Sequence, residues 1–594
     1  MSKPGYDLII RGGDVIDGTG APRQRADVAV SDGLIVRIAP QIDGDAADEI
    51  DAGGLIVAPG FIDSHTHLEG QLFWDPIAGP SSRHGSTTVI LGSCGLSLAP
   101  LHPDDREFGA ALMSAVEQIP QSILMSQVPF DWTGFDGFMR SLEQLRTGVN
   151  VGAFVGYSVV RHAAMGERAF TDAALPEDLD LIETLLVQAL DAGALGVSFN
   201  RATYDKDHHG RLMAGWDADW SEIRRAAAVV GRYPGAMLQV IPSWANLADG
   251  WSERNEAEVE AWTSILVETG CRLVWSAVSE RHYAPQMEAT RRVRGSGGRM
   301  TAGIHSVPLY SFATFAAPCL FASTQECRFL FDLTPTDRLA ALRDPAVRER
   351  IRASMGPETF VGYPLQYVSE TGEESLGIAR TYSWSNIYYV GSPPERFVVG
   401  ESISEMATRL GKHPVDVVLD AALASGLQDV FVVFVYGNLP DVTEQLLMDP
   451  ATVISSNDTG AHLMLMAQTQ TTHLLSHWVR ESGVLTMEQA VHLLTGRQAS
   501  AFGIEGRGVL AEGMAADIVV FDADEVGPQA PAIAHDLPGG GSRFVCDSLG
   551  IRRVIVNGST ILRDDQPTGA LPGSVVRPND RAIPVSLEQP PSGG

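Results

Sequence analysis

The stretch that decides the fold is an apolar run that ends in two histidines one residue apart, and it reads Leu55-Ile56-Val57-Ala58-Pro59-Gly60-Phe61-Ile62-Asp63-Ser64-His65-Thr66-His67. The apolar residues predict a buried strand, and the Pro-Gly pair marks a turn within it. Side chains alternate across a strand with period two, so His65 and His67 lie on one face, where each can give a nitrogen to one zinc-sized ion. The alternative is a polar strand end with satisfied hydrogen bonds, and the buried strand that precedes the pair favours the ligand interpretation.

The bulk composition is that of a large, acidic, globular protein. Of its 594 residues, 44% are hydrophobic and 20% are charged, and the formal net charge is −30. A chain of this length can form a barrel-sized core and a smaller module. The negative charge repels nucleic-acid phosphate and anionic lipid, so we expect neither nucleic acid nor a membrane as a partner. We expect instead a small-molecule substrate and a homo-oligomeric protein.

The cysteines and the first residues of the chain indicate a cytoplasmic protein. The five cysteines are scattered and odd in number, which fits reduced thiols better than a disulfide framework. The first ten residues lack the charged lead and apolar core of a secretory signal, and no apolar run reaches the length of about 20 residues that a membrane-spanning helix needs.

The order of apolar runs predicts an α/β protein, a distorted (β/α)8 TIM-like barrel with a small β-sandwich built from both chain ends. Short strand-like runs separated by turns fill the first 58 residues and return near residues 516–521 and 553–556. Between them, strand-like runs alternate with helical stretches, as in a parallel barrel. The expected domains are an N-terminal β part at 1–58, a barrel at 59–500 with an insertion at about 306–400, and a C-terminal β part with a tail at 501–594.

In such a barrel, catalytic groups gather at the carboxyl ends of the strands. Asp458 follows a late strand, where a carboxylate can bind a metal and take a proton from its water. Cys94 follows an early strand and is either a thiolate ligand or a small buried residue. Ser198 and Asn200 stand at the end of another strand-like run.

At these residues the chain resembles the amidohydrolase superfamily, and within it the N-acyl-D-amino-acid deacylase (D-aminoacylase) branch. The resemblance runs nearly from end to end, through Pro59-Gly60-Phe61-Ile62-Asp63-Ser64-His65-Thr66-His67, His84-Gly85-Ser86-Thr87-Thr88, Cys94-Gly95, Ala192-Gly193-Ala194-Leu195-Gly196-Val197-Ser198 and Asp458-Thr459-Gly460-Ala461-His462. It implies a barrel in which zinc is held by His65, His67, Cys94 and Asp458. It also implies that a metal-activated water attacks an amide carbonyl while the aspartate carries the proton to the leaving amine.

The chain departs from the family pattern where a second metal would bind. Family members with a full site have one histidine on the fifth strand and one on the sixth, but here these runs carry Gln239 and Ser276. The glycine-histidine pair after the third strand is replaced by Gly156 and Tyr157. Glutamine, serine and tyrosine are poor zinc ligands when neutral, so we predict one well-held zinc ion.

Other polar residues are weaker candidates for contacts around the site. Glu69 has the same strand parity as His67 and either touches the site or lies in a solvated turn. His84 and His462 either orient the ligands through hydrogen bonds or simply pack. Arginines 161, 201 and 380 can clamp a substrate carboxylate, although most arginines lie at surfaces. His208 and His209, beside Asp205 and Asp207, favour a solvated turn over a metal cluster. The full set of secondary candidates is Glu69, Tyr157, Ser198, Gln239, Ser276, Arg161, Arg201, Arg380 and His462.

Three functions remain open on the sequence. The first is a zinc-dependent hydrolase of an N-acyl amino acid, of either configuration, or of a related small amide. The second keeps metal-dependent hydrolysis but changes the substrate to a cyclic amide, carbamate, ester or peptide-like natural product. The third is a binding or assembly protein that keeps the scaffold without catalysis. The intact His65, His67 and Asp458 argue against this third function, because a purely structural role would not require them.

Overall fold

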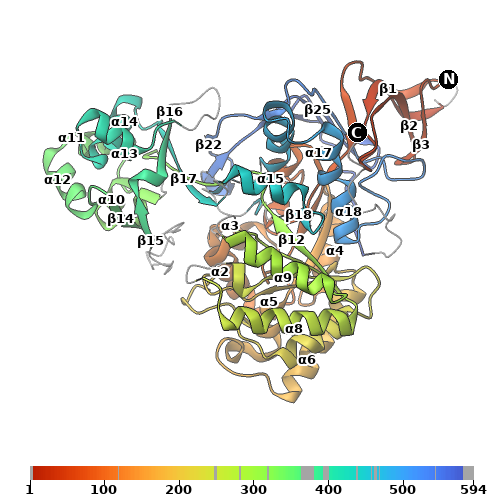
Figure 1. The fold of residues 1–594 in the computed structure, drawn as a ribbon, viewed down its shortest axis with the longest axis horizontal. Helices are drawn as coiled ribbons and strands as arrows, with labels where there is room; N and C mark the ends of the chain where they lie inside the picture. The colour runs from red at the N-terminus through yellow and green to blue at the C-terminus, as the bar shows by residue number, and fades with distance from the viewer. Residues whose placement is uncertain are drawn as a thin grey trace.

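A parallel sheet of eight strands lies at the centre of the described chain (Figure 1). The computed structural model describes residues 5–578 except 118, 246–249, 280–281, 317–319, 363–379, 392–399, 437–438, 456–457, 461–464, 467–468 and 542. The central strands follow one another in space as they do in sequence: β6 (Phe61–Asp63), β7 (Ser86–Leu91), β8 (Asn150–Gly156), β9 (Gly196–Asn200), β10 (Met237–Ile241), β11 (Arg272–Trp275), β12 (Arg299–Ile304) and β18 (Thr452–Ile454). Parallel neighbours need crossover connections, and helices supply them.

The first and last strands of this sheet approach each other, so the sheet curls into a distorted barrel. The Ser64 hydroxyl donates to the carbonyl of Ile454 at 3.4 Å, and the N–H of His67 donates to the carbonyl of Thr459 at 2.8 Å. These contacts bring the segment after β6 beside the segment after β18. The predicted α/β fold class is confirmed.

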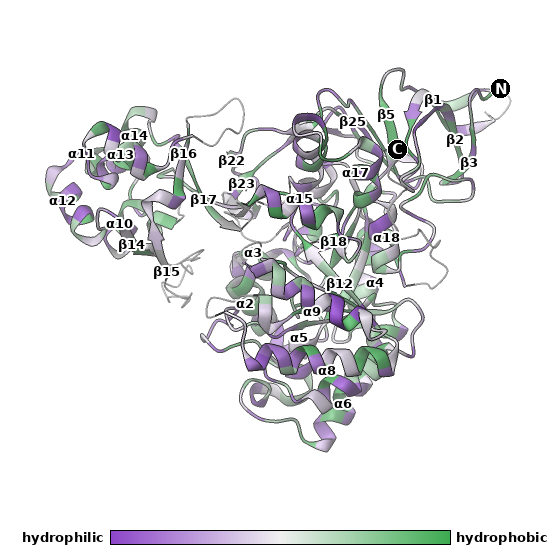
Figure 2. Cartoon of the chain, viewed as in Figure 1, coloured by the Kyte–Doolittle hydropathy of each residue, from purple (hydrophilic) through white to green (hydrophobic). Residues whose placement is uncertain are grey.

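Helices cover the outside of the curled sheet. Figure 2 shows hydrophilic residues along α8 and α9, as expected of helices with one solvent-facing side. In α6, Ile182, Leu186 and Ala189 are buried at spacings of four and three residues. The helices are α1 (Gly79–Ser82), α2 (Arg106–Glu117), α3 (Gln121–Gln127), α4 (Phe135–Leu145), α5 (Tyr157–Met165), α6 (Pro176–Asp191), α7 (Trp220–Val230), α8 (Glu253–Thr269), α9 (Tyr283–Gly295), α15 (Pro440–Met448), α16 (Gln470–His473), α17 (Met487–Leu494), α18 (Gly496–Phe502) and the π-helix η8 (Leu474–Glu481). Within the described residues, no helix combines the length and the apolar character needed to cross a lipid bilayer.

Strands from both chain ends pair in a second sheet, which confirms the predicted β module. In this sheet β5 pairs antiparallel with β20, and Ala58 lies opposite Val519. Side chains from both ends, among them Val28 and Val520, form one hydrophobic cluster. The strands in order are β27 (Gln566–Pro567), β26 (Ser559–Arg563), β25 (Ile551–Val556), β20 (Ile518–Phe521), β5 (Ile56–Pro59), β1 (Tyr6–Val15), β2 (Gln24–Ser31) and β3 (Leu34–Ala39), and β4 (Ala46–Asp51) pairs with β1.

A lobe leaves the barrel after β12 and stands apart from it in Figure 1. It contains β13 (Leu309–Ala313), α10 (Gln325–Phe331), α11 (Pro335–Arg343), α12 (Pro345–Ser354), β14 (Thr359–Gly362), β15 (Arg380–Ser383), β16 (Ile387–Gly391), α13 (Ile403–Leu410), α14 (Pro414–Ser425) and β17 (Val430–Tyr436). These elements share their own hydrophobic cluster, in which Phe321 packs with Val418 and Phe431. Because helices beyond residue 400 belong to this cluster, we propose that the inserted segment continues to about β17.

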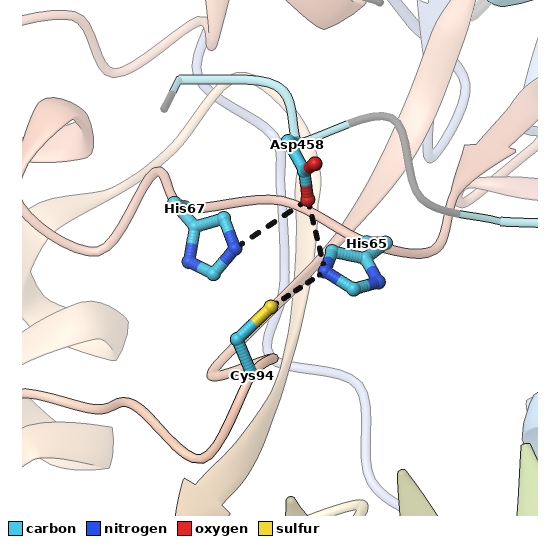
Figure 3. Close-up of side chains that lie close together, drawn as sticks. All are labelled: His65, His67, Cys94 and Asp458. Atoms are coloured by element: carbon cyan, nitrogen blue, oxygen red, sulfur yellow. Dashed lines mark hydrogen bonds and ion pairs between the residues drawn. The ribbon is translucent and has the colours of Figure 1, made fainter. Parts of the chain in front are cut away.

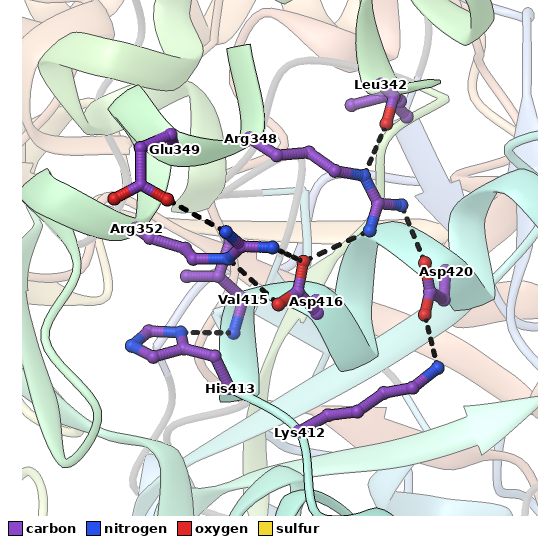
Figure 4. A network of polar contacts seen from close by, with 9 residues as sticks. All are labelled: Leu342, Arg348, Glu349, Arg352, Lys412, His413, Val415, Asp416 and Asp420. Atoms are coloured by element: carbon purple, nitrogen blue, oxygen red, sulfur yellow. Dashed lines mark hydrogen bonds and ion pairs between the residues drawn. The ribbon is translucent and has the colours of Figure 1, made fainter. Parts of the chain in front are cut away.

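Ion pairs between helices also hold the lobe together (Figure 4). Asp416 on α14 accepts from Arg352 at 2.8 Å and from Arg348 at 3.1 Å, both on α12. Arg348 reaches Asp420 at 2.6 Å, and Lys412 donates to the same carboxylate at 2.7 Å. The two helices are therefore joined by charge as well as by apolar packing.

Candidate metal centre

Four side chains that the sequence singled out as ligands meet at the carboxyl end of the barrel strands (Figure 3). Nε2 of His65 lies 3.0 Å from Oδ1 of Asp458 and 3.1 Å from Sγ of Cys94. Nε2 of His67 lies 3.7 Å from the same Asp458 oxygen. One donor atom from each residue lies within 4.8 Å of the others. Two imidazoles, a thiol and a carboxylate at this spacing form a donor set that zinc takes in proteins.

Local backbone geometry places these four donors. His65 and His67 follow β6 at a spacing of two and therefore point to the same side. Cys94 and Asp458 occupy the left-handed region, with φ of 58° and 44°. For a residue other than glycine this conformation costs about 1–2 kcal/mol, and such strain gathers at functional sites. Two of the four donors are therefore held in a costly backbone conformation.

Neighbouring polar groups from other strands hold the loops that carry the donors. The Gln239 side-chain oxygen accepts from the N–H of Cys94 at 3.0 Å, and the Ser198 hydroxyl accepts from Gly95 at 3.1 Å. Ser276 Oγ lies 3.4 Å from Nδ1 of His65. All three side chains are buried. Each of them contacts a donor or its loop from a different barrel strand.

Glu69 is also buried at this end of the barrel. One of its carboxylate oxygens accepts from the N–H of Gly92 at 2.6 Å, two residues before Cys94. Among the described residues the other oxygen has no hydrogen-bond partner. Glu69 thus lies in the buried site, where the sequence had left a solvated turn as an alternative.

Burial and nearby carboxylates alter the protonation of the donors. Burial lowers the pKa of His67, but the carboxylates of Glu117 and Asp458 outweigh it and raise this pKa to about 9. Burial, followed by the same two carboxylates, raises the pKa of the Cys94 thiol. Burial acts to raise the pKa of Asp458, but His65 and His67 hold it well below its ordinary value. His67 and Cys94 therefore keep protons that a divalent cation would displace, whereas Asp458 is already a carboxylate anion.

Sequence analysis did not predict two residues near the donors, the buried Glu117 and the partly buried His305. Glu117 ends α2, and its Oε1 lies 3.5 Å from Nε2 of His67. His305 directly follows β12, and burial lowers its pKa to about 4, with the charge of Asp458 opposing that shift. A histidine directly after a barrel strand and a glutamate among the apolar residues of a helix were the available signals. Neither has a spacing relation to the His65–His67 pair that would have linked it to the site.

Two of the candidate arginines lie in buried ion pairs with carboxylates of the barrel helices. Arg161 donates to Glu222 at 2.8 Å, and the Tyr157 hydroxyl donates to the same carboxylate at 2.6 Å. Arg201 lies 3.3 Å from Glu258 and stacks 4.3 Å from the centre of the Trp220 ring. Each guanidinium already has a carboxylate partner. Arg380 opens β15, and neither its side chain nor His462 is among the described parts of the chain.

His84 and the segment of His208 and His209, which the sequence also singled out, form hydrogen bonds within the fold. His84 lies between Thr472 and the carbonyl of Cys546, each 2.7 Å from a ring nitrogen, and burial lowers its pKa to about 4. Asp207 closes the turn at His208 and His209 by accepting from the N–H of His209 at 2.9 Å. The hydrogen bonds of Asp207 within this segment agree with the turn interpretation.

Comparisons with known proteins agree with this architecture. A family model described as the amidohydrolase family matches residues 48–310 and 395–562, and the unmatched interval falls in the lobe. An N-acyl-D-aspartate deacylase of Alcaligenes xylosoxydans xylosoxydans is 29% identical over 98% of this chain and 97% of its own. An N-acyl-D-glutamate deacylase of the same organism is 27% identical over 96% of each chain.

A solved structure is similar along nearly its whole length. The crystal structure of an N-acyl-D-glutamate deacylase from Bordetella bronchiseptica, complexed with zinc and a phosphonate inhibitor, has a TM-score of 0.62 and 26% identity, and the match covers 96% of this chain and 99% of that chain. The family model spans most of the present chain, on both sides of the lobe. The chain therefore belongs to the amidohydrolase family and is a hydrolase of carbon–nitrogen bonds other than peptide bonds.

Proposed function

We propose that this protein is a zinc-dependent hydrolase that releases the acyl group from an N-acyl amino acid, with D-configured amino acids as the first substrates to test. The convergence of His65, His67, Cys94 and Asp458 within 4.8 Å carries the proposal. The similarity to deacylases of N-acyl-D-aspartate and N-acyl-D-glutamate over 96–98% of the chain supports the substrate class.

The four residues fit zinc, and their exposure suggests where the substrate binds. Zinc bound there would polarise the amide carbonyl and lower the pKa of a water from about 15.7 to about 7. The side chains of His65 and His67 are 1% and 0% exposed, whereas that of Asp458 is 22% exposed. Asp458 and Cys94 are the partly exposed members of this group, and Asp458 is the one that carries a carboxylate. We assign to it the transfer of a proton from water to the leaving amine.

We propose a single zinc ion. Gln239 and Ser276, which stand on β10 and near the end of β11, are neutral side chains engaged with Cys94 and His65. Neutral amide and hydroxyl groups are weak ligands for zinc, so they supply little for a second ion. Metal analysis that returns two zinc ions per chain would contradict this count.

The decisive experiment combines a substrate panel with removal of the metal. Purified protein is assayed on acylated amino acids of both configurations before chelation, after chelation and after zinc is restored. Activity on at least one member that disappears on chelation and returns with zinc supports the proposal. Metal binding without cleavage of any acyl amino acid would favour cyclic amides, carbamates, esters or peptide-like products as substrates. Absence of both metal binding and hydrolysis would favour a binding or assembly protein.

Asp458→Asn tests the proton-transfer role with little disturbance of the backbone. Asparagine tolerates the left-handed conformation that residue 458 adopts, so we expect the variant to fold. Asp32→Asn is a matched control, because Asp32 also has a left-handed φ, of 51°, and lies exposed in the turn between β2 and β3. We expect loss of turnover in the first variant and none in the second. Equal turnover in both would remove the role that we assign to Asp458.

Two properties of the whole protein also remain proposals. We propose that it is cytoplasmic, because its five cysteines are few and scattered, as in proteins with reduced thiols. We also propose a homo-oligomer, which size-exclusion chromatography with light scattering would test. A monomeric mass of about the calculated 63.7 kDa would contradict it.

A further inference from the structure

A cavity of about 870 Å³ lies between the base of the lobe and strands near the C-terminus. Its walls come from β13, from the π-helix η8 with the residues just before it, and from the short strands β21 (Gly527–Pro528) and β24 (Ser548–Leu549). None of the four donors of the metal centre is among the described residues that line it. The cavity is therefore separate from the proposed catalytic centre.

Two histidines one helical turn apart line this cavity. His473 ends α16, His477 lies four residues later on η8, and the centres of their rings are 5.1 Å apart. The ring centres of His65 and His67, the pair in the four-donor cluster, are 5.5 Å apart. Histidines four residues apart on one helical face can give two nitrogens to one metal ion. The pair in the cavity thus has the spacing of a two-nitrogen metal site.

The contacts of the two rings leave nitrogen atoms for an ion. Nδ1 of His477 lies 3.1 Å from Oε2 of Glu481, and because a carboxylate only accepts, this nitrogen donates and Nε2 of the neutral ring keeps its lone pair. Histidines that bind metals are commonly oriented by a carboxylate in this way. Nδ1 of His473 is buried and has no hydrogen-bond partner among the described residues. Burial, followed by the charge of His477, lowers the pKa of His473 to about 3, so its ring is neutral, the form that binds metals.

Charge and access both favour a cation in this cavity. The described residues that line it include three carboxylates and one guanidinium, those of Glu481, Asp524, Glu525 and Arg480. The guanidinium donates to the backbone carbonyls of Ala523 at 3.2 Å and Val526 at 2.7 Å. The side chain of His477 is 40% exposed, so an ion can reach it from solvent.

We propose that His473 and His477 bind a divalent transition-metal ion in this cavity, with water completing its coordination. Imidazole nitrogens suit zinc, copper and nickel. Because two protein ligands hold an ion less firmly than four, we expect dialysis to remove this ion and to leave the zinc of the four-donor cluster. The zinc count of the dialysed protein therefore reports on that cluster alone. The new site shares no residue with the cluster, so it does not depend on the proposed function.

The test adds nickel(II) to dialysed, zinc-loaded protein and measures its binding by titration calorimetry. Wild type is compared with His477→Gln, with Glu481→Gln and with His102→Gln, a control at a histidine whose side chain is 69% exposed beside Asp104. We expect wild type and control to bind one nickel ion per chain, and His477→Gln to bind it at least about tenfold more weakly. Glu481→Gln should weaken nickel binding by about tenfold, because His477 loses the carboxylate that orients its ring. Zinc content after the titration should be the same in all four proteins.

Three results would overturn the proposal. They are wild-type protein that takes up no nickel, His477→Gln that binds nickel as tightly as the wild type, and an equal loss of affinity in His102→Gln. If His477→Gln does not fold, Glu481→Gln decides, because its side chain is 60% exposed and its replacement leaves the core unchanged. Unchanged nickel affinity in that variant would then overturn the proposal. Hydrolysis of acyl amino acids is measured without nickel, so failure of the proposed function leaves this result unaffected.

Discussion

Replacing Arg161 with methionine tests whether this arginine stabilises the barrel or binds substrate. Its guanidinium donates to Glu222 at 2.8 Å, to the carbonyl of Asp172 at 3.0 Å and to the carbonyl of Ala169. Arg161 and Glu222 are each 4% exposed as residues. Arg161→Met would leave the Glu222 carboxylate buried, with the Tyr157 hydroxyl at 2.6 Å still donating to it.

The expected destabilisation is large because a buried charge loses its partner. Removing one member of a buried ion pair costs about 3–5 kcal/mol. The entropy of unfolding is about 2.1 cal/mol/K per residue, or about 0.6 kcal/mol/K for a cooperative unit of about 300 residues. Division gives a fall in melting temperature of about 5–8 °C. Adding Glu222→Gln to Arg161→Met should recover part of this loss, because it removes the unpaired charge.

The assay is thermal unfolding of the wild type, of Arg161→Met and of the double variant Arg161→Met with Glu222→Gln. The KM of each for the best substrate found is measured as well. Arg168→Met is a control, since Arg168 is 42% exposed in its pair with Asp178 and should contribute no more than about 1 kcal/mol. A variant at Arg161 that melts with the wild type but has a strongly raised KM would refute the structural role. Such a result would restore the substrate-carboxylate role that the sequence had left open.

Three further outcomes follow from other parts of the structure. Residue 94 has a left-handed backbone, which glycine adopts without strain. Without metal, the Cys94→Gly variant should therefore have a free energy of unfolding about 1 kcal/mol higher than the Cys94→Ala variant. A glycine variant that is less stable than the alanine variant would argue against backbone strain at this position. Burial lowers the pKa of His84 to about 4, so the stability that the neutral ring contributes is present above pH 6.5 and is lost as the pH falls toward 4. The loss of unfolding free energy at pH 5 should be about 2 kcal/mol. A His84→Gln protein with the same fall in melting temperature between pH 7 and pH 5 as the wild type would contradict this. Asp416→Asn should weaken the pairs with Arg348 and Arg352 by roughly 1 kcal/mol. Hydrogen exchange in α12 and α14 should then become faster, while zinc affinity stays the same. Unchanged exchange in these two helices would count against the ion-pair network.

Structural features that depend on the local order of residues could be predicted from the sequence. The alternation of strand-like and helical runs predicted the parallel barrel, and the return of strand patterns near the C-terminus predicted a β module shared by both chain ends. A change in composition predicted an insertion at about 306–400. We propose that it continues to about β17, because α13 and α14 join the hydrophobic cluster of the lobe and its extent depends on which helices pack together.

The sequence by itself determined that His65 and His67 share a face, because strand side chains alternate with a period that can be counted along the chain. It also placed Cys94 and Asp458 after strands, at the barrel end where such residues meet. Only the tertiary structure decided that Glu117 reaches His67, that Arg161 and Arg201 pair with Glu222 and Glu258, and that Gln239 supports the Cys94 loop. These contacts join residues whose separation in the chain follows no period, so they depend on how helices and strands pack against one another in three dimensions.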